Sequence, residues 1–163
     1  GSIEASLRIR DILGCCRIKS IPVVHVQHQS VRPGAAFMVP GSNGAAIHDN
    51  VKPLDSEKVF LKFFPNSFRA TGLDDYLKEN SITKLVITGM MTHMCIDTTV
   101  RAAYDLGYQC IVASDCCATR DLAIDGRVIP ARDVHDSFIA ALNGTFARVV
   151  DSRGVMEYLN SGK

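Results

Sequence analysis

Residues 84–107, KLVITGMMTHMCIDTTVRAAYDLG, contain the signals of a strand, a turn and a helix in direct succession. The first six residues form a short apolar run of the kind found in strands buried on both faces. From residue 95 to residue 106, Ile96, Val100 and Ala103 recur at helical spacing, and Gly107 suits the C-cap. The stretch therefore predicts a βα unit, with the residues around Cys95 at the carboxyl end of the strand.

Four other short apolar runs share the texture of this strand. They lie at residues 21–28, 59–64, 110–113 and 146–150. Helical spacing occurs at residues 3–16, at 73–78, after Pro130 and at 154–159. Because strands alternate with helices and no turn signal joins two of these strands, the sequence predicts an α/β fold with a mainly parallel sheet. Asp125-Gly126 could turn a small hairpin, but it falls inside a predicted loop.

Length and charge limit the possible classes of protein. The chain has 163 residues, of which 47% are hydrophobic, and this predicts a single domain over residues 1–163. Eighteen Lys plus Arg against seventeen Asp plus Glu give a formal charge of +1, which argues against a nucleic-acid or anionic membrane partner. No apolar run reaches the roughly 18 residues of a membrane span, and no secretion signal is evident. We expect a cytoplasmic protein that acts on a small molecule.

The six cysteines are predicted to be thiols. Cys15-Cys16 and Cys116-Cys117 are adjacent pairs, which cannot form unstrained bridges. No C-x-x-C spacing occurs, which argues against a thiol redox protein. The five histidines show no metal-ligand spacing, so we expect neither a metal nor another cofactor. Among them, His28 and His93 are candidates either for substrate contact or for framework hydrogen bonds.

Two residues at strand ends stand out as candidates for chemistry, because parallel sheets bind ligands at the carboxyl ends of their strands. Cys95 is predicted to lie at a helix N-terminus, where N–H groups favour a thiolate. The alternative is a small buried apolar residue. Lys62 is surrounded by five apolar residues in the predicted strand at residues 59–64, where a charged lysine needs an anion beside it, unless it reaches water from an edge strand. Asp115, at the end of another strand, is predicted to cap the following loop.

Residues 89–99 and 101–108 together resemble the nucleophile region of isochorismatase-like cysteine hydrolases. Further similarity lies in residues 21–26, in Lys62 with residues 66–68, and in residues 114–119. The resemblance implies a three-layer α/β/α, Rossmann-like fold with six parallel strands and a Cys-Lys-Asp triad. It matches Cys95 to the nucleophile and Lys62 to the triad lysine.

The same resemblance implies further details of the site. The Met90–Met91 peptide bond is expected to be cis, and the N–H groups of Met91 and Cys95 are expected to form the oxyanion hole. Phe68 matches an aromatic position near the substrate, and we expect His28 there as well. Family members commonly form homodimers or homotetramers. A nicotinamidase activity is less favoured, since no Asp-x-His metal motif is present.

The sequence departs from the family pattern at its beginning. The triad aspartate of the family ends a first strand, and only five of the six strands are visible here. We therefore expect that a segment upstream of Gly1 carries this strand, and that the chain alone is inactive. The activity implied is hydrolysis of a small amide-like C–N bond through an acyl-enzyme on Cys95. The alternatives are an isochorismatase-type vinyl-ether hydrolysis and a non-catalytic binding protein.

The long segment at residues 29–57 contains several Pro and Gly residues and has no clear periodicity. Loops of this length are often functional. We interpret it as a lid or substrate loop. Its apolar residues Phe37, Met38 and Val39 are suited to cover either a pocket or an interface between subunits.

Overall fold

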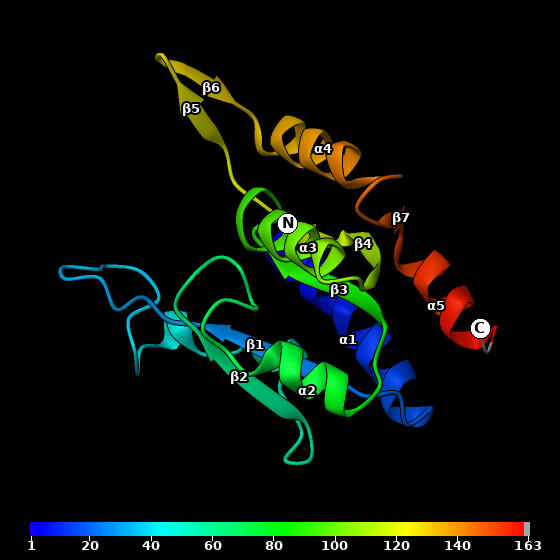
Figure 1. Ribbon diagram of the computed structural model, residues 1–163. Coiled ribbons are helices and arrows are strands. Elements are labelled where there is room, and N and C mark those ends of the chain that lie inside the picture. The colour runs from blue at the N-terminus through cyan, green and yellow to red at the C-terminus, as the bar shows by residue number, and fades with distance from the viewer. Residues whose placement is uncertain (162–163) are drawn as a thin grey trace.

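Parallel strands between two layers of helices make up the computed structural model, which describes residues 1–161 (Figure 1). The parallel strands are β1 (Val24–His28), β2 (Lys58–Lys62), β3 (Lys84–Met90), β4 (Gln109–Ala118) and β7 (Arg148–Val150). The α-helices are α1 (Ser2–Ile18), α2 (Leu73–Glu79), α3 (Asp97–Asp105), α4 (Ala131–Leu142) and α5 (Ser152–Asn160). The predicted α/β/α fold is confirmed, and each of the five predicted apolar runs overlaps one strand.

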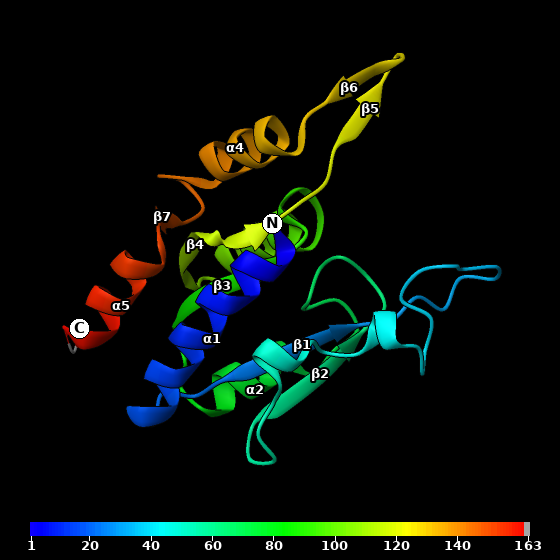
Figure 2. The same ribbon diagram turned by 180° about the vertical axis from the view of Figure 1, so that it is seen from behind.

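The parallel strands form two separate sheets. One sheet pairs β1 with β2, and the other has the order β3-β4-β7. Every pair in both sheets is parallel. Within residues 1–161, β1 and β3 form no ladder with each other, although Figures 1 and 2 show the two sheets on either side of one space beside α1.

Alternation along β4 divides the core between the two helix layers. Cys110 and Val112 belong to a buried cluster with residues of α2, α3 and α4. Ile111 and Ala113, the residues between and after them, belong to a second cluster with residues of α1 and α5. Successive side chains of a strand point to opposite faces, so β4 is covered on both sides. This explains why its apolar residues form a continuous run in the sequence.

A hairpin appears where the sequence predicted only a loop. Strands β5 (Leu122–Ile124) and β6 (Arg127–Ile129) pair antiparallel around Asp125 and Gly126. These two residues have φ values of 50° and 74°, as a two-residue hairpin turn with both central residues left-handed requires. In Figure 1 the hairpin extends away from the rest of the chain. The Asp-Gly pair was the signal for this turn.

The loop between β1 and β2 is fixed to α1 at its end. It contains two short 3-10 helices, η1 (Asn43–Ala45) and η2 (Asp49–Val51). The Glu57 carboxylate accepts hydrogen bonds from Nε and Nη2 of Arg17 and from the Leu54 N–H, and its Oε2 lies 2.9 Å from Nε2 of His25. Phe37, in the first half of the loop, is exposed. A lid or interface role for the loop stays a prediction. No helix among the described residues is long and apolar enough to cross a membrane.

Candidate active site

Cys95 lies in a turn that directly follows β3. Residues Thr92–Ile96 form one π-helical turn, and α3 begins at Asp97. The prediction of a regular helix from residue 95 was therefore wrong by two residues. The Met91 carbonyl accepts hydrogen bonds from the N–H groups of Met94 and Ile96, at 3.1 and 3.2 Å, and neither bond uses the N–H of Cys95. The Met90–Met91 peptide bond is cis.

Side chains from α4 and from the end of β4 hold this turn. Thr92 is fully buried, and its hydroxyl lies 2.9 Å from Nδ1 of His135 on α4. Nδ1 of His93 lies 2.5 Å from the hydroxyl of Thr119, and its ring meets the Phe138 ring edge-on. Burial, and to a lesser degree the charge of Arg120, lowers the pKa of His93. The Nδ1 atom of His93 is thus engaged in a framework hydrogen bond.

Lys62 is buried at the carboxyl end of β2. Only 4% of this residue is exposed, and its Nζ donates a hydrogen bond to the Pro65 carbonyl at 2.5 Å. Within residues 1–161, no carboxylate lies within 4.0 Å of Nζ. Among these residues β2 pairs only with β1 and is therefore an edge strand. Lys62 nevertheless points into the molecule rather than to water.

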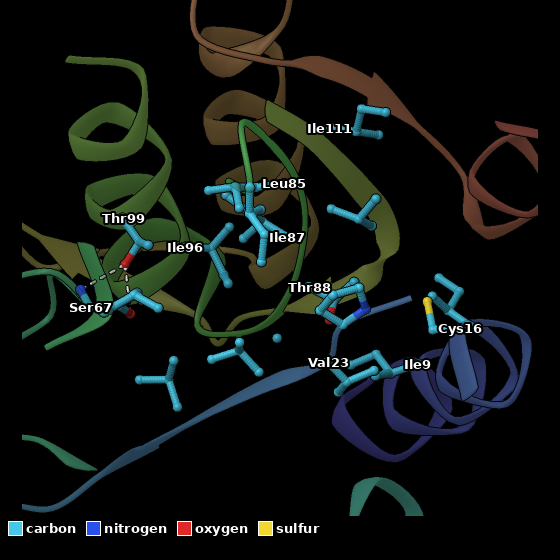
Figure 3. A pocket seen from close by; sticks show the side chains of 18 of the residues that line it. Ile9, Cys16, Val23, Ser67, Leu85, Ile87, Thr88, Ile96, Thr99 and Ile111 are labelled. Carbon is cyan, nitrogen blue, oxygen red and sulfur yellow. Dashed lines mark hydrogen bonds between the residues drawn. The ribbon is translucent and has the colours of Figure 1, made fainter. Parts of the chain in front are cut away.

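A chain of hydrogen bonds connects the lysine to the helix after the cysteine. The hydroxyl of Thr99 on α3 lies 3.4 Å from the Pro65 carbonyl, accepts from the Ser67 N–H and donates to the Ser67 hydroxyl. Figure 3 shows the bonds between Thr99 and Ser67. Thr99 follows Cys95 by four residues, one helical turn. The carboxyl ends of β2 and β3 therefore meet, and Lys62 and Cys95 line the same cavity of about 590 Å³.

The structure brings together some of the predicted site residues and not others. Phe68 also lines the cavity, with its ring stacked on Tyr108 at 5.9 Å between ring centroids. His28 is the neighbour of Lys62 across the β1–β2 ladder, but neither it nor Met91 lines the cavity. Burial, and then the charge of Lys62, lowers the pKa of His28. Its Nδ1 is buried without a hydrogen-bond partner among the described residues.

Cys95 differs from the other cysteines in its access to solvent. All six are free thiols, and Cys95 alone is not buried. Burial raises the pKa of Cys110 to about 11 and is the main reason that the pKa of Cys116 rises to about 12. Deeply buried thiols of this kind are poor nucleophiles. Among the described residues, no group of three or more His, Cys, Asp or Glu side chains could hold a metal ion.

The sequence did not indicate the positioning residues Ser67 and Thr99. The only available signal was the hydroxyl of Thr99, one helical turn after Cys95. Threonine is common on helix surfaces, so this position could not be singled out. Asp115 lies inside β4 rather than at the end of a strand, and the predicted cap of the following loop was wrong. Its carboxylate accepts from the N–H and hydroxyl of Ser152, at the start of α5, and not from the loop that follows β4.

Comparison with known proteins places this geometry in a family. The chain is 44% identical over 146 residues to the uncharacterized isochorismatase family protein YddQ of Bacillus subtilis, covering 90% of this chain and 81% of that protein. It is 31% identical over 140 residues to streptothricin hydrolase of Streptomyces noursei, covering 86% and 48% of the two chains.

The solved structures show the same relation. The crystal structure of a putative isochorismatase hydrolase from Oleispira antarctica superposes with a TM-score of 0.92 at 44% identity, covering 96% of this chain and 83% of that one. The sequence model of the isochorismatase domain matches residues 1–153, which include Cys95 and Lys62. With the sequence match and the superposition in agreement, this chain belongs to the isochorismatase family of hydrolases.

Proposed function

We propose that the protein hydrolyses an amide-like C–N bond of a small molecule, with Cys95 as the nucleophile. The observation that carries the proposal is the cavity in which Cys95, the one cysteine that is not buried, lies with the buried cation Lys62. The relative named streptothricin hydrolase gives further support for a hydrolytic reaction.

The reaction would proceed through an acyl-enzyme. A general base takes the thiol proton of Cys95, and the sulfur attacks the carbonyl carbon while the π electrons move to its oxygen. Collapse of this intermediate breaks the C–N bond, and the amine leaves with a proton. Water then attacks the thioester, which releases a carboxylic acid and regenerates the thiol. The family resemblance assigns the base to an aspartate, and no carboxylate of residues 1–161 lies beside Lys62.

Lys62 would stabilise the negative charge that forms during this reaction. A buried ammonium without an anion is unfavourable, and a thiolate in the same cavity supplies one. We assign the oxyanion hole to the N–H groups of Met91 and Cys95, where developing charge on the carbonyl oxygen would be stabilised. Phe68 and His28 are proposed to contact the substrate, Phe68 from within the cavity and His28 from the adjacent strand end.

Acylation by an activated ester tests the nucleophile without requiring strong base catalysis. After incubation with p-nitrophenyl acetate, we expect the mass increase of one acetyl group on the peptide that contains Cys95. Cys95→Ala should abolish it, and Lys62→Met should slow it by about tenfold or more, because the stabilising charge is lost. The matched control is Lys58→Met, which removes an exposed lysine from the same strand. Acetylation that is equally fast in Cys95→Ala would disprove the proposed nucleophile.

A panel of small amides and vinyl ethers then separates the candidate reactions. Amide turnover that disappears in Cys95→Ala supports the proposal. Vinyl-ether turnover that survives this substitution supports the isochorismatase-type reaction, in which the cysteine is less important. Equal traces for both proteins on every compound, with retained binding, indicate a binding protein if p-nitrophenyl acetate also leaves Cys95 unmodified, because a chain without the expected aspartate can be acylated without turning over an amide. We propose a homodimer or homotetramer as the functional form, and sedimentation equilibrium measures it.

A further inference from the structure

Two hydroxyl groups are buried between α3 and the loop that follows β2. Ser67 is 7% exposed and Thr99 is 8% exposed. The Thr99 hydroxyl accepts a hydrogen bond from the Ser67 N–H at 3.1 Å and donates one to the Ser67 hydroxyl at 3.0 Å, as Figure 3 shows. Because one hydroxyl both accepts from and donates to the same residue, it fixes the position of that residue against α3.

The loop at residues 63–70 depends on this contact for its attachment to α3. It contains no helix or strand. The N–H groups of Phe68 and Arg69 donate to the side-chain and backbone oxygens of Asn66, and these bonds shape a turn within the loop. Among residues 1–161, the hydrogen bonds between the loop and α3 are all made by Thr99. Loss of its hydroxyl therefore frees the loop to move relative to the helix.

The same loop supplies the hydrogen-bond acceptor of Lys62. The Nζ atom donates to the carbonyl of Pro65, two residues before Ser67, and no second acceptor for it is found within residues 1–161. A lysine side chain is a flexible four-carbon stem, so its ammonium follows the acceptor that holds it. Because Lys62 is buried, water does not readily replace that acceptor. The position of the ammonium therefore depends on where Pro65 is held.

Thr99 belongs to the segment that carries the nucleophile. It follows Cys95 by four residues, and both side chains line the cavity together with Lys62. We propose that Thr99 is a positioning residue, which sets the distance between the Lys62 ammonium and the Cys95 sulfur through Ser67 and Pro65. This inference rests on the proposed function, because the distance matters only where the charge of Lys62 acts on the sulfur.

A purely structural pair of hydroxyls is the alternative. Buried hydroxyls are normally hydrogen-bonded, so Thr99→Val should lower the thermal midpoint under either explanation. Stability therefore does not separate the two roles. A measurement of the positive charge near the Cys95 sulfur does separate them.

Two alkylating reagents of similar size provide this measurement. With iodoacetate and with iodoacetamide, the Cys95 sulfur forms the same bond to the CH₂ carbon and iodide leaves, but only iodoacetate carries a negative charge. The fraction of thiolate affects both rates equally, so it cancels in their ratio. An ammonium near the sulfur favours the anionic reagent and raises the ratio of the iodoacetate rate to the iodoacetamide rate. Peptide mass spectrometry measures both rates at Cys95.

The expected ratios follow from the chain of hydrogen bonds. Lys62→Met should lower the ratio by about threefold or more, and Thr99→Val should lower it by a similar factor. Thr99→Ser keeps the hydroxyl and should stay within about twofold of the unmodified protein. Thr98→Val, the matched control on the same helix, should leave the ratio unchanged.

A double variant tests whether Thr99 acts through Lys62. The ratio of the Lys62→Met, Thr99→Val protein should be no lower than that of Lys62→Met alone, because the charge that Thr99 positions is already absent. Ser67→Ala removes the partner hydroxyl without a change in α3 and should lower the ratio by a smaller factor than Thr99→Val. If Thr99→Val does not fold, Ser67→Ala decides the test.

Three outcomes would overturn the proposal. The first is a ratio in Thr99→Val, or in Ser67→Ala if only that variant folds, that equals the ratio of the unmodified protein. The second is a double variant whose ratio falls clearly below that of Lys62→Met, since Thr99 would then act independently of the lysine. The third is an unchanged ratio in Lys62→Met. Alkylation requires no hydrolysis, so the expected ratios without acylation by p-nitrophenyl acetate or amide turnover would reject the proposed function and keep Thr99 as a positioning residue.

Discussion

At the scale of single residues, Glu57 carries a large electrostatic effect outside the candidate site. Its side chain is 8% exposed and joins α1, β1 and the long loop through Arg17, His25 and Leu54. Hydrogen bonds from Arg17 are the largest cause that lowers its pKa from 4.5 to about 2. A carboxyl group whose pKa is lower in the folded state stabilises the fold above pH 4.5, and this contribution is lost as the pH falls through about 2.

Glu57→Gln should therefore destabilise the protein by about 2–3 kcal/mol at pH 7, and by progressively less toward pH 2. Urea unfolding across this pH range measures the difference. The control Glu79→Gln, an exposed position at the end of α2, should change the unfolding free energy little at any pH. A loss from Glu57→Gln that is the same at pH 3 and pH 7 would contradict the electrostatic explanation.

The candidate site shows what single residues reveal in a sequence. Cys95 could be selected because it follows a predicted strand, where parallel sheets bind ligands, and Lys62 because a lysine among five apolar residues needs an anion. Thr99 could not be selected, because its role depends on the approach of the loop at residues 65–67 to α3, which no local pattern encodes. His93 was left open between two roles for the same reason, since Thr119 lies far from it in the sequence.

At the scale of elements, the π-helical turn that holds Cys95 depends on its contact with α4. The Thr92 hydroxyl is fully buried and is hydrogen-bonded to His135, so removing it leaves a ring nitrogen unpaired. Thr92→Val keeps the shape of the side chain and should cost about 1–3 kcal/mol of stability. It should also lower the rate at which iodoacetamide alkylates Cys95, because the turn loses its anchor.

Thr98→Val is the matched control for this prediction. Thr98 lies on α3, is partly rather than fully buried, and has no side-chain hydrogen bond among the described residues. It should change neither the thermal midpoint nor the alkylation rate appreciably. If Thr92→Val lowers the midpoint but leaves alkylation unchanged, the contact with α4 supports the fold and does not position the cysteine.

The β5–β6 hairpin and α1 offer a pair of glycine substitutions with opposite expected effects. Gly126 has a φ of 74° in the hairpin turn, so Gly126→Ala should strain the turn by roughly 1 kcal/mol. Gly14 lies inside α1 with open space at its Cβ position, so Gly14→Ala should stabilise the helix by about 0.5–1 kcal/mol. Thermal unfolding measures the second effect. Limited proteolysis at residues 121–129 measures the first, since the hairpin extends away from the core.

At the scale of the whole molecule, the sequence predicts the layers better than the continuity of the sheet. Strands buried on both faces and amphipathic helices leave patterns in a single segment, so the α/β/α layers could be predicted. Pairing between distant strands leaves no such pattern. Only the family resemblance, through the expected sixth strand, suggested that the five visible strands would not form one sheet. The structure separates them between β1 and β3.

This separation predicts unequal local stability. The β1–β2 sheet has only two strands, and β2 is exposed at most of its positions, whereas β4 is paired on both sides and largely buried. A two-stranded sheet has little stability of its own, so β1–β2 depends on the packing of Val24 and Phe60 against the buried core cluster.

In native-state hydrogen exchange, amides of β1 and β2 should therefore exchange through openings whose free energy is at least about 2 kcal/mol lower than that of the openings in β4. Urea at low concentration should lower the β1–β2 opening energy first, because this part can detach while the β3-β4-β7 sheet stays folded. Equal opening energies in β1 and β4, with the same urea dependence, would show that the two sheets unfold as one cooperative unit. The coupling between the two sheets would then have to pass through α1, which packs against β3 and β4 and is joined to β1 by the hydrogen bonds of Arg17 and His25 to Glu57.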